Sequence, residues 1–393
     1  MNDRWLILAV LTFARTVMGF QFQSVAAVSP YVLDYFQMSY AVLGTVIGLY
    51  LLPGAAVALP GGVLAQRYGD KFIVCIGLAA MTLGGVIMGA SNNYAILFGG
   101  RVISGCGAVL LNVLVTKMVT DWFQGREIVT ALGILITSWP LGIAAALVVL
   151  PTLAEATSWS IVTYAAAALS GAAFLLVAAF YRTPANRNGS PSLGLSIGLS
   201  RRELVLAILA GLVWTFYNIA FIIVLAFGSE FLIASGQGRL AASAMISTVS
   251  WIIIPAIPIG AWASERIGRP DLTMIGCFLL VALAIWWLAA IGPSLALLVA
   301  IGFIFGPPGG LIMTLPGEAA PPERRAVTMG IYFTCYYVGM GILPPIAGYA
   351  RDLTGSAATP LWFAGAMAVL ASICLVQFRL VQSQKTQTPK AVG

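Results

Sequence analysis

Long apolar stretches alternate with short polar segments along the whole chain. Runs such as 41–64, 72–90 and 361–378 contain no charged side chain, and each is close to the length of about 20 residues that a helix needs to cross a bilayer. A segment in lipid must satisfy its own backbone donors and acceptors, and these runs lack the alternation of barrel strands. The pattern therefore predicts an all-α integral membrane protein.

Twelve membrane-spanning helices are predicted, in two sets of six. The first six are expected at 5–27, 41–64, 72–90, 95–118, 128–150 and 159–181. The second six are expected at 203–227, 240–263, 272–291, 294–316, 326–347 and 360–379.

A long polar stretch separates the two sets. We expect a first six-helix bundle over 1–181, a cytoplasmic linker over 182–202, a second bundle over 203–382 and a cytoplasmic tail over 383–393. The Pro, Gly and Ser content of the linker favours a solvated connection. A docking site for another protein is the alternative interpretation.

An internal repeat relates the two halves. The segment 61–71 (GGVLAQRYGDK) recurs at 260–270 (GAWASERIGRP), and 125–134 (GREIVTALGI) has an echo at 323–331 (ERRAVTMGI). Both pairs are offset by about half of the chain, which indicates a duplicated unit. Two pseudo-symmetric bundles would place a solute site between them near mid-membrane.

Composition and charge agree with a membrane protein. Of the residues 60% are hydrophobic and 8% charged, whereas soluble domains carry about 25% charged residues. The net charge of +7 does not indicate nucleic acid, because the basic residues gather on the segments that share a side with the N-terminus. Only Arg239 and Arg351 fall on the other side. The positive-inside rule then predicts cytoplasmic termini, and we expect a bacterial inner membrane.

Two arginines lie inside predicted spans. Arg15 follows Trp5 by ten residues, which places it roughly 15 Å deep, and Arg101 is shallower. All 13 acidic residues lie at or near span ends or in loops. Burying an arginine costs about 2.5–3.5 kcal/mol on insertion scales, so it normally faces a partner or a cavity. We hypothesise that an anionic substrate supplies the missing charge through forked hydrogen bonds.

Each arginine also has a structural interpretation. Carbonyls and water could satisfy Arg15, and Arg101 could brace neighbouring helices or reach the outer interface. Lys117, near the cytoplasmic end of the same span as Arg101, is expected to extend to the interface.

Further candidate binding residues share helix faces. Asn112 follows Arg101 at the spacing of one face of the fourth span, with small residues between them. The other candidates are polar or aromatic residues of the seventh and eleventh spans, and packing is the alternative for the aromatic ones. They are Trp214, Tyr217, Asn218 and Tyr336.

Two motifs resemble those of a known transporter family. The matching residues are Gly62, Arg67, Gly69 and Lys71 in the loop after the second span, and Arg101, Gly105 and Gly107 in the fourth span. On these motifs the chain resembles the major facilitator superfamily over essentially its whole length. The resemblance implies twelve helices in two bundles and a cytoplasmic gate at the loop motif.

The loop motif departs from the family pattern at its acidic position. Gln66 stands where the family has an acid, and Asp70 stands where a base is expected, so the charge relay of the family motif lacks its usual acid. The second copy keeps an acid, Glu265. The predicted gate residues are Gly62, Gln66, Arg67 and Gly69 in the first copy and Glu265, Arg266 and Gly268 in the second.

Within the superfamily, two segments are similar to cyanate and nitrate/nitrite-type anion porters. They are 121–127 (DWFQGRE) and 137–143 (TSWPLGI). The glycine-rich signature of nitrate porters is absent from the fifth and eleventh spans, which argues against nitrate itself.

Proline and glycine interrupt several spans, among them the second, which is broken at Pro53-Gly54. Pro140 lies within the fifth span, and Gly306, Pro307 and Pro308 belong to a Gly-Pro-Pro-Gly-Gly run in the tenth. Proline removes a helical hydrogen bond and bends the helix. Pro140 and the three named residues of the tenth span are predicted hinges, with a static kink as the alternative.

Catalytic and metal-binding signatures are missing from the sequence. It contains no histidine, its five cysteines are scattered singly, and it has no phosphate-binding loop of the GxxxxGK[ST] type. We expect no enzymatic activity, no cofactor and no metal. Without an acid near mid-membrane, we also expect coupling that does not run through a titrating carboxylate.

Three functions remain open. The leading one is secondary transport of a small inorganic or organic anion by a monomer in the lipid bilayer. The second is export of apolar or cationic drug-like compounds, which the aromatic and methionine content permits. The third is a membrane sensor or scaffold, which would need a signalling domain beyond the short polar segments seen here.

Overall fold

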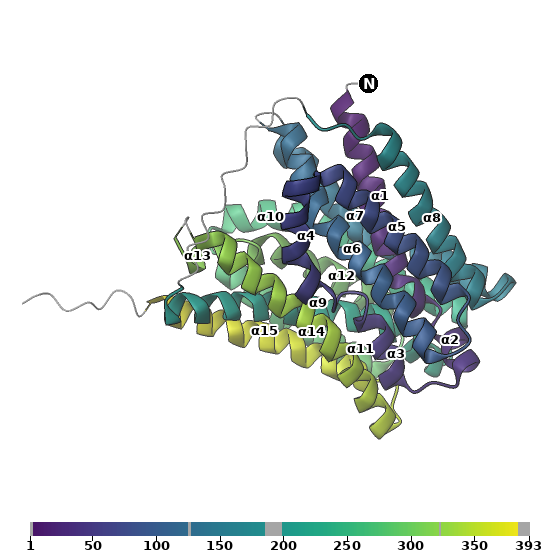
Figure 1. Cartoon of the computed structure of the whole chain (residues 1–393). Coiled ribbons are helices and arrows are strands. Elements are labelled where there is room, and N and C mark those ends of the chain that lie inside the picture. Colours follow the sequence, from purple (N-terminus) through teal and green to yellow (C-terminus); the bar gives the residue numbers. More distant parts are fainter. Residues whose placement is uncertain (1–2, 125–126, 185–198, 322–323, 384–393) are drawn as a thin grey trace, which may run out of the picture.

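The computed structural model describes residues 3–124, 127–184, 199–321 and 324–383, and these ranges are helical without strands (Figure 1). Most of the expected linker, 185–198, and the expected tail from residue 384 onward lie outside the described residues.

The first half of the chain forms the helices α1 (Asp3–Ala27), α2 (Ser29–Phe36), α3 (Tyr40–Gly48), α4 (Gly54–Tyr68), α5 (Asp70–Gly89), α6 (Tyr94–Phe123), α7 (Ile128–Ala156) and α8 (Trp159–Phe180). The second half forms α9 (Arg201–Ala234), α10 (Arg239–Ile267), α11 (Pro270–Ile291), α12 (Leu295–Ile312), α13 (Leu315–Ala319), α14 (Arg325–Thr354) and α15 (Thr359–Ser383). Among the described residues, eleven helical segments are long and apolar enough to cross a membrane.

The second crossing is broken, which explains why eleven single segments stand for twelve predicted spans. The sequence predicts one span over 41–64 that is broken at Pro53-Gly54, and the structure divides it there into α3 and α4. The break spans Leu49 to Pro53, just before Gly54, where proline removes a helical donor. Together α3 and α4 occupy the place of one crossing.

The tenth crossing differs from its prediction. α12 continues through Pro307 and Pro308, and the interruption comes later, at Met313 and Thr314, before the short α13. The Gly-Pro run therefore lies inside a helix instead of ending one.

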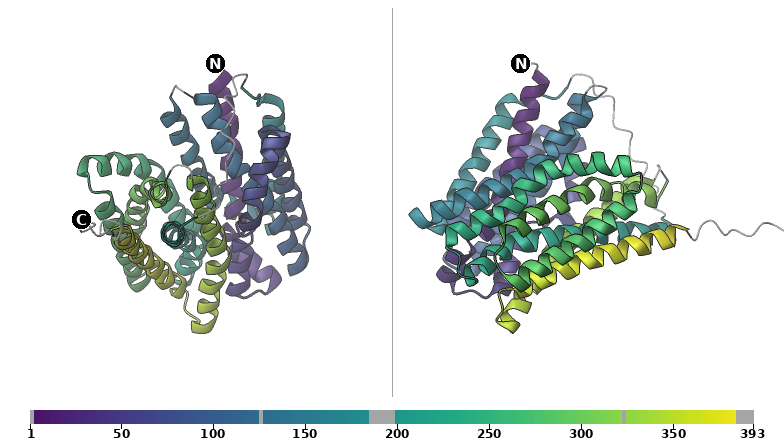
Figure 2. Two further views of the ribbon diagram at one scale, coloured as in Figure 1. Left: turned by 60° about the vertical axis from the view of Figure 1, so that its left-hand side comes forward. Right: turned by 180° about the vertical axis from the view of Figure 1, so that it is seen from behind.

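Each bundle is held by its own close helix pairs. In the first bundle α5 packs on α6 and α8, and α1 packs on α7; in the second, α10 packs on α12 and α9 on α15. Contacts between the bundles are made by α14 with α3 and α4, by α7 with α10, and by α1 with α9. Under the predicted repeat, the contact of α14 with α3 and α4 corresponds to that of α7 with α10, and α1 corresponds to α9. Figure 2 shows the two bundles from two further sides.

The repeat is also visible at the ends of equivalent helices. Gly69 closes α4 with φ 91°, and Gly268 closes α10 with φ 64°. Positive φ is readily adopted by glycine. The same backbone requirement thus explains the same residue at the two equivalent positions.

The bundles join at one end of the molecule. Hydrogen bonds between them, such as Ser29 to Glu230 and Tyr40 to Asp352, lie near α2 and α3, away from the N-terminus (Figure 1). Within the described ranges no hydrogen bond or ion pair links the bundles at the opposite end, and there the ribbons diverge (Figure 1). The molecule is therefore closed at one end only.

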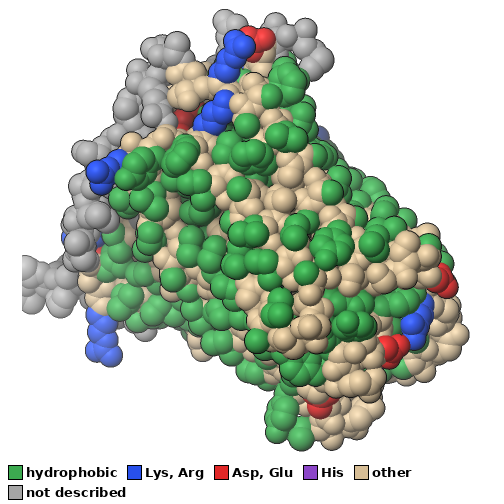
Figure 3. All heavy atoms as spheres, turned by 45° about the vertical axis from the view of Figure 1, so that its right-hand side comes forward, with side chains coloured by type: hydrophobic (Ala, Val, Ile, Leu, Met, Phe, Trp, Pro, Cys, Tyr) green, Lys and Arg blue, Asp and Glu red, His purple; other side chains and the backbone are tan. Residues whose placement is uncertain are grey.

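The outer surface is that of an integral membrane protein. Large apolar side chains such as Leu175, Leu283 and Trp287 are more than half exposed. Hydrophobic side chains cover much of the face in Figure 3, and the charged ones lie near its ends. Such a surface is favourable only in contact with lipid.

Close helix approach in the first bundle depends on glycine. A Cβ at Gly107 of α6 would overlap the backbone of α5, including the Met81 nitrogen at 2.9 Å, and one at Gly105 would overlap the Tyr50 carbonyl. Gly105, one of the small residues between Arg101 and Asn112, therefore faces packed protein and no open space. Small residues serve helix packing here.

Gly107→Ala is expected to lower the free energy of unfolding by about 1–3 kcal/mol, because the added methyl group overpacks the interface of α5 with α6. Gly99, on the same helix, has nothing within 4 Å of a Cβ, so Gly99→Ala should leave stability unchanged or raise it through helix propensity. Thermal unfolding of both variants in one detergent provides the measurement. Equal melting temperatures would contradict the packing role.

Candidate functional site

Arg15 lies at the junction of three helices of the first bundle. Its Nη1 donates to the carbonyl of Leu135 on α7 at 2.7 Å, and its Nε donates to Oδ1 of Asn112 on α6 at 3.3 Å. Both acceptors are neutral, and none of the ion pairs among the described residues involves Arg15. Its side chain remains partly exposed. The structure thus brings Arg15 and Asn112 together, as predicted candidates, without an acidic partner.

Two tyrosines of the second bundle approach this arginine. Tyr336 and Tyr337 of α14 lie near Arg15, and the side chain of Tyr337 lies close to that of Asn112. Tyr337 is only 2% exposed and was not among the predicted site residues. Its place next to Tyr336, in a run of aromatic residues, is the signal that could have indicated it.

A stack of aromatic rings continues from Tyr336 into the second bundle. The ring of Trp214 lies 6.1 Å from that of Tyr336, 5.6 Å from Tyr217 and 6.2 Å from Tyr332, measured between centroids. Contacts of this kind stabilise packing and present flat apolar surface. Tyr336 is the member of the stack that lies near Arg15.

Two predicted site residues form hydrogen bonds within their own bundle. The Tyr217 hydroxyl donates to the carbonyl of Phe305 at 2.7 Å, and the Asn218 amide donates to the carbonyl of Trp214 at 2.8 Å. In this conformation both bonds stay within the second bundle, and the part of these two residues in substrate binding stays a prediction.

Arg101 is enclosed by protein, which departs from the predicted clamp. It is 0% exposed, and its guanidinium donates to the carbonyls of Val46 at 2.9 Å, Gln21 at 3.1 Å and Phe22 at 2.6 Å. It also lies 4.5 Å from the ring centroid of Tyr50. Carbonyls of α1 and α3 thus replace the acid that the sequence lacks, and Arg101 braces α6 against both helices.

The predicted gate residues lie at the open end. In the first copy Gln66 and Arg67 are exposed, with Arg67 over the ring of Tyr68; in the second, Glu265 and Arg266 are exposed. Among the described residues neither copy forms an ion pair across the bundles. Gly62 is half-buried on α4 with open space around it. Their part in gating remains a prediction.

Lys117 does not extend freely to the interface. Its Nζ lies 2.5 Å from Oδ2 of Asp70 and 3.4 Å from Oδ2 of Asp121. Asp70 begins α5 and is 4% exposed. The acid that stands in an unexpected place of the loop motif therefore ties α5 to α6.

The predicted hinge residues lie at packed helix contacts. The Pro140 carbonyl accepts a hydrogen bond of 3.1 Å from Ser250 of α10, across the bundles. Pro307 packs against Gly260, and Gly306 packs against Ala256 of the same helix, so this segment is held within its bundle. Pro308 is buried inside α12. Movement at these positions stays a prediction.

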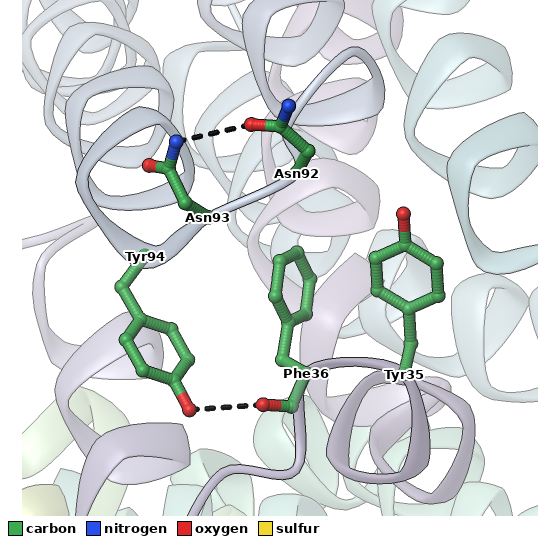
Figure 4. Close-up of a pocket in the computed structure, with 5 residues that line it drawn as sticks. All are labelled: Tyr35, Phe36, Asn92, Asn93 and Tyr94. Carbon is green, nitrogen blue, oxygen red and sulfur yellow. Dashed lines mark hydrogen bonds between the residues drawn. The ribbon is translucent and has the colours of Figure 1, made fainter.

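A separate cavity of about 400 Å³ lies at the closed end, lined by Tyr35, Phe36, Asn92, Asn93 and Tyr94 (Figure 4). The Tyr94 hydroxyl donates to the Phe36 carbonyl at 2.9 Å, and the Asn93 amide donates to Oδ1 of Asn92 at 3.0 Å. Exposed tyrosines with polar tips are typical of the aromatic belt at a membrane surface. No charged side chain lines the cavity. Its tyrosines are best explained as anchors at the membrane surface.

No metal site is evident in the described part of the chain, where no three His, Cys, Asp or Glu side chains gather closely enough to hold an ion. The cysteines there are free.

Comparison with protein families gives two matches to the Major Facilitator Superfamily, over residues 11–235 and 204–392. Together they span nearly the whole chain, and both include most or all of α9.

Individual relatives are more distant. The Hexuronate transporter of Bacillus subtilis (strain 168) is 20% identical in an alignment of 404 positions. The alignment covers 96% of this chain and 95% of that protein. The MFS-type efflux transporter ffsH of Aspergillus flavipes is 29% identical over 119 residues, or 30% of this chain, and the match spans only 21% of that protein. The chain thus spans a small part of the length of that relative.

Solved structures share the fold. A bacterial homologue of the human lysosomal transporter Spinster, in an inward-facing and unoccupied conformation, is 15% identical, with both chains covered to 100% and a TM-score of 0.72. A D-xylose-proton symporter is 15% identical over 95% of this chain and 97% of its own, with a TM-score of 0.77.

Arg101→Lys is expected to lower the free energy of unfolding by about 2 kcal/mol or more, since an ammonium cannot reach the carbonyls of two helices at once and leaves buried acceptors unpaired. Arg266→Lys, at an exposed position on α10, is the matched control and should have little effect. Melting temperatures in detergent provide the measurement, and equal values for the two variants would contradict the bracing role.

Proposed function

Because the chain belongs to the Major Facilitator Superfamily, we propose that it is a secondary transporter that carries a small anion across a bacterial inner membrane by alternating access. The observation that carries this proposal is Arg15, which lies where the two bundles meet and has only neutral partners among the described residues.

Arg15 retains capacity to bind a ligand. Its Nε and Nη1 are engaged, and its Nη2 has no hydrogen-bond partner among the described residues. A cation at this depth is stabilised by a counter-ion, and guanidinium donates strongly to carboxylates and similar oxyanions. An incoming anion would provide the negative charge that these contacts lack.

The number of available charges indicates a monovalent anion. Arg101 is occupied by carbonyls of α1 and α3, and Lys117 is paired with Asp70. Arg15 is then the remaining cation for the site, and one guanidinium matches one carboxylate.

The aromatic stack favours an organic anion over an inorganic one. Tyr336 approaches Arg15 from the second bundle, and Trp214 lies behind it. A ligand with a flat or ring-shaped body could contact these rings while its anionic group meets Arg15. Similarity to the hexuronate transporter agrees with this class, because a hexuronate has one carboxylate on a ring. The resemblance to cyanate and nitrate/nitrite porters stays a hypothesis.

Alternating access is supported by the asymmetry of the molecule. If the basic segments face the cytoplasm, the closed end near α2 and α3 faces outward and the structure is inward-facing. The bundles would then rock about the junction that contains Arg15, exposing it to each side in turn. Both termini would be cytoplasmic, and we propose a monomer.

Export of apolar or cationic compounds is the second candidate. The aromatic stack favours it, as does a local match of 73 residues, 40% identical, to the Methylenomycin A resistance protein of Bacillus subtilis (strain 168). The uncompensated charge of Arg15 argues against a cationic substrate.

Benzoate is expected to raise the melting temperature of the detergent-solubilised protein, since a ligand that binds only the folded form stabilises it by about 2.7 kcal/mol at 100 times its Kd. Benzyl alcohol and benzylamine, which keep the ring without the carboxylate, should give no shift, and formate should give a smaller one. Arg15→Ala should abolish the benzoate shift, whereas Arg266→Ala should retain it. A shift that survives Arg15→Ala, or one that is equal for benzylamine, would overturn the anion proposal.

Benzoate affinity is also expected to change by less than about twofold between pH 6 and pH 8, since carboxylates with ordinary pKa values near 4 and arginine both stay charged across this range. Binding isotherms at fixed ionic strength would measure this. A tenfold change would indicate that a group titrating near neutrality takes part in binding.

A further inference from the structure

The closed end is held by polar contacts that join residues of opposite bundles. Tyr40, at the start of α3, meets Arg351 and Asp352 of α14 across the bundles. Glu230 of α9, in the same bundle as Arg351, lies next to that arginine. We call these four residues the latch.

Asp352 caps a helix of the other bundle. Its Oδ1 accepts from the backbone N–H of Tyr40 and its Oδ2 from that of Ala41, both at 2.9 Å. These donors lie in the first turn of α3, where backbone N–H groups lack helical partners and a carboxylate is favoured. Asp352 itself lies in the last turn of α14, where a negative charge is unfavourable for its own helix. The carboxylate of Asp352 is therefore favoured by the N-terminus of α3 and not by its own helix.

Arg351 connects the same tyrosine to a buried acid. Its Nη2 donates to the Tyr40 hydroxyl at 2.7 Å, and the guanidinium lies over the Tyr40 ring. The same Nη2 of Arg351 lies 4.0 Å from Oε2 of Glu230. Both charged side chains are only 8% exposed. Glu230 also accepts from the hydroxyl of Ser29 at 2.9 Å.

Close backbone approach makes these contacts possible. A Cβ at Gly348 of α14 would overlap the backbone of Tyr40, and one at Gly44 of α3 would overlap that of Pro344. α3 and α14 therefore touch along their length, and Asp352 reaches the end of α3 only while they do. Separation of the bundles would break the cap and expose Arg351 and Glu230 to water together.

An exposed ion pair also joins the bundles at this end, away from the latch. Arg239 and Asp34 lie 3.1 Å apart, with their side chains 46% and 69% exposed. Exposed pairs contribute little to stability. This pair therefore serves as an internal comparison for the latch.

We infer that the latch is the outer gate of the transporter and sets the balance between the conformation seen here and the one open at this end. The inference rests on alternating access but not on the identity of the substrate. Because the hydrogen-bonding groups of the latch are polar or charged, water can hydrate them when the gate opens, so the latch is reversible. Weakening it should shift the population toward the state that is open at this end.

Pulsed electron paramagnetic resonance can test the shift with two pairs of spin labels. Asn92→Cys and Leu295→Cys would label the closed end, and Val63→Cys and Ile267→Cys the open end, each pair with one exposed position per bundle. The five native cysteines would first be replaced by serine or alanine. The full chain is used in detergent, without substrate.

Asp352→Asn should increase the population with a long closed-end distance about tenfold, as expected when a charge-assisted hydrogen bond becomes neutral. The open-end distance should shorten in the same fraction of molecules. Tyr40→Phe, which keeps the ring and loses the hydroxyl, should act in the same direction with a smaller effect. The control Asp34→Asn should change either population by less than about twofold.

Three results would overturn the latch: unchanged distances in Asp352→Asn and Tyr40→Phe, a closed end that lengthens without reciprocal shortening at the open end, or an equal effect of Asp34→Asn. The benzoate thermal shift is read separately. Failure of the anion proposal would therefore leave the latch intact, and failure of the latch would leave the binding result unchanged.

Discussion

The hydrocarbon core of a bilayer contains no water, so each polar group placed there must find its partner within the protein. This constraint governs how the chain uses its few interior charges. Arg101 meets it with three backbone carbonyls and becomes a structural brace. Arg15 meets it only in part, with one carbonyl and one amide oxygen. Arg101, whose hydrogen-bond donors are all close to protein acceptors, is therefore part of the scaffold. Arg15, which keeps a donor without such a partner in the described part of the chain, is the candidate site residue.

The two bundles contribute unlike chemistry to the site. The first supplies charge and a hydrogen-bonding amide through Arg15 and Asn112, and the second supplies aromatic surface through Tyr336 and Trp214. A substrate that needs both would bind fully only where the bundles face each other. That division gives a physical reason for a site at the junction, since neither half could hold such a ligand alone.

Much of the architecture could be predicted from the sequence because lipid imposes strong patterns. Span lengths, the repeat and the family motifs all led to two six-helix bundles, which the structure and the family comparison confirm. The break at Pro53 and Gly54 was indicated correctly. At Pro307 the helix continues, because proline shows where a donor is lost and not whether neighbours hold the helix together. The contact of Lys117 with Asp70 joins segments that are distant in the chain, and a single sequence does not show which distant side chains meet.

The bracing of Arg101 has a consequence for the variation that this fold tolerates. Its acceptors are main-chain oxygens of Gln21, Phe22 and Val46, which every amino acid possesses. The side chains at these three positions can therefore diverge without removing the acceptors, provided that the helices keep their course. Among descendants of a common ancestor, an arginine here would persist without any correlated substitution opposite it.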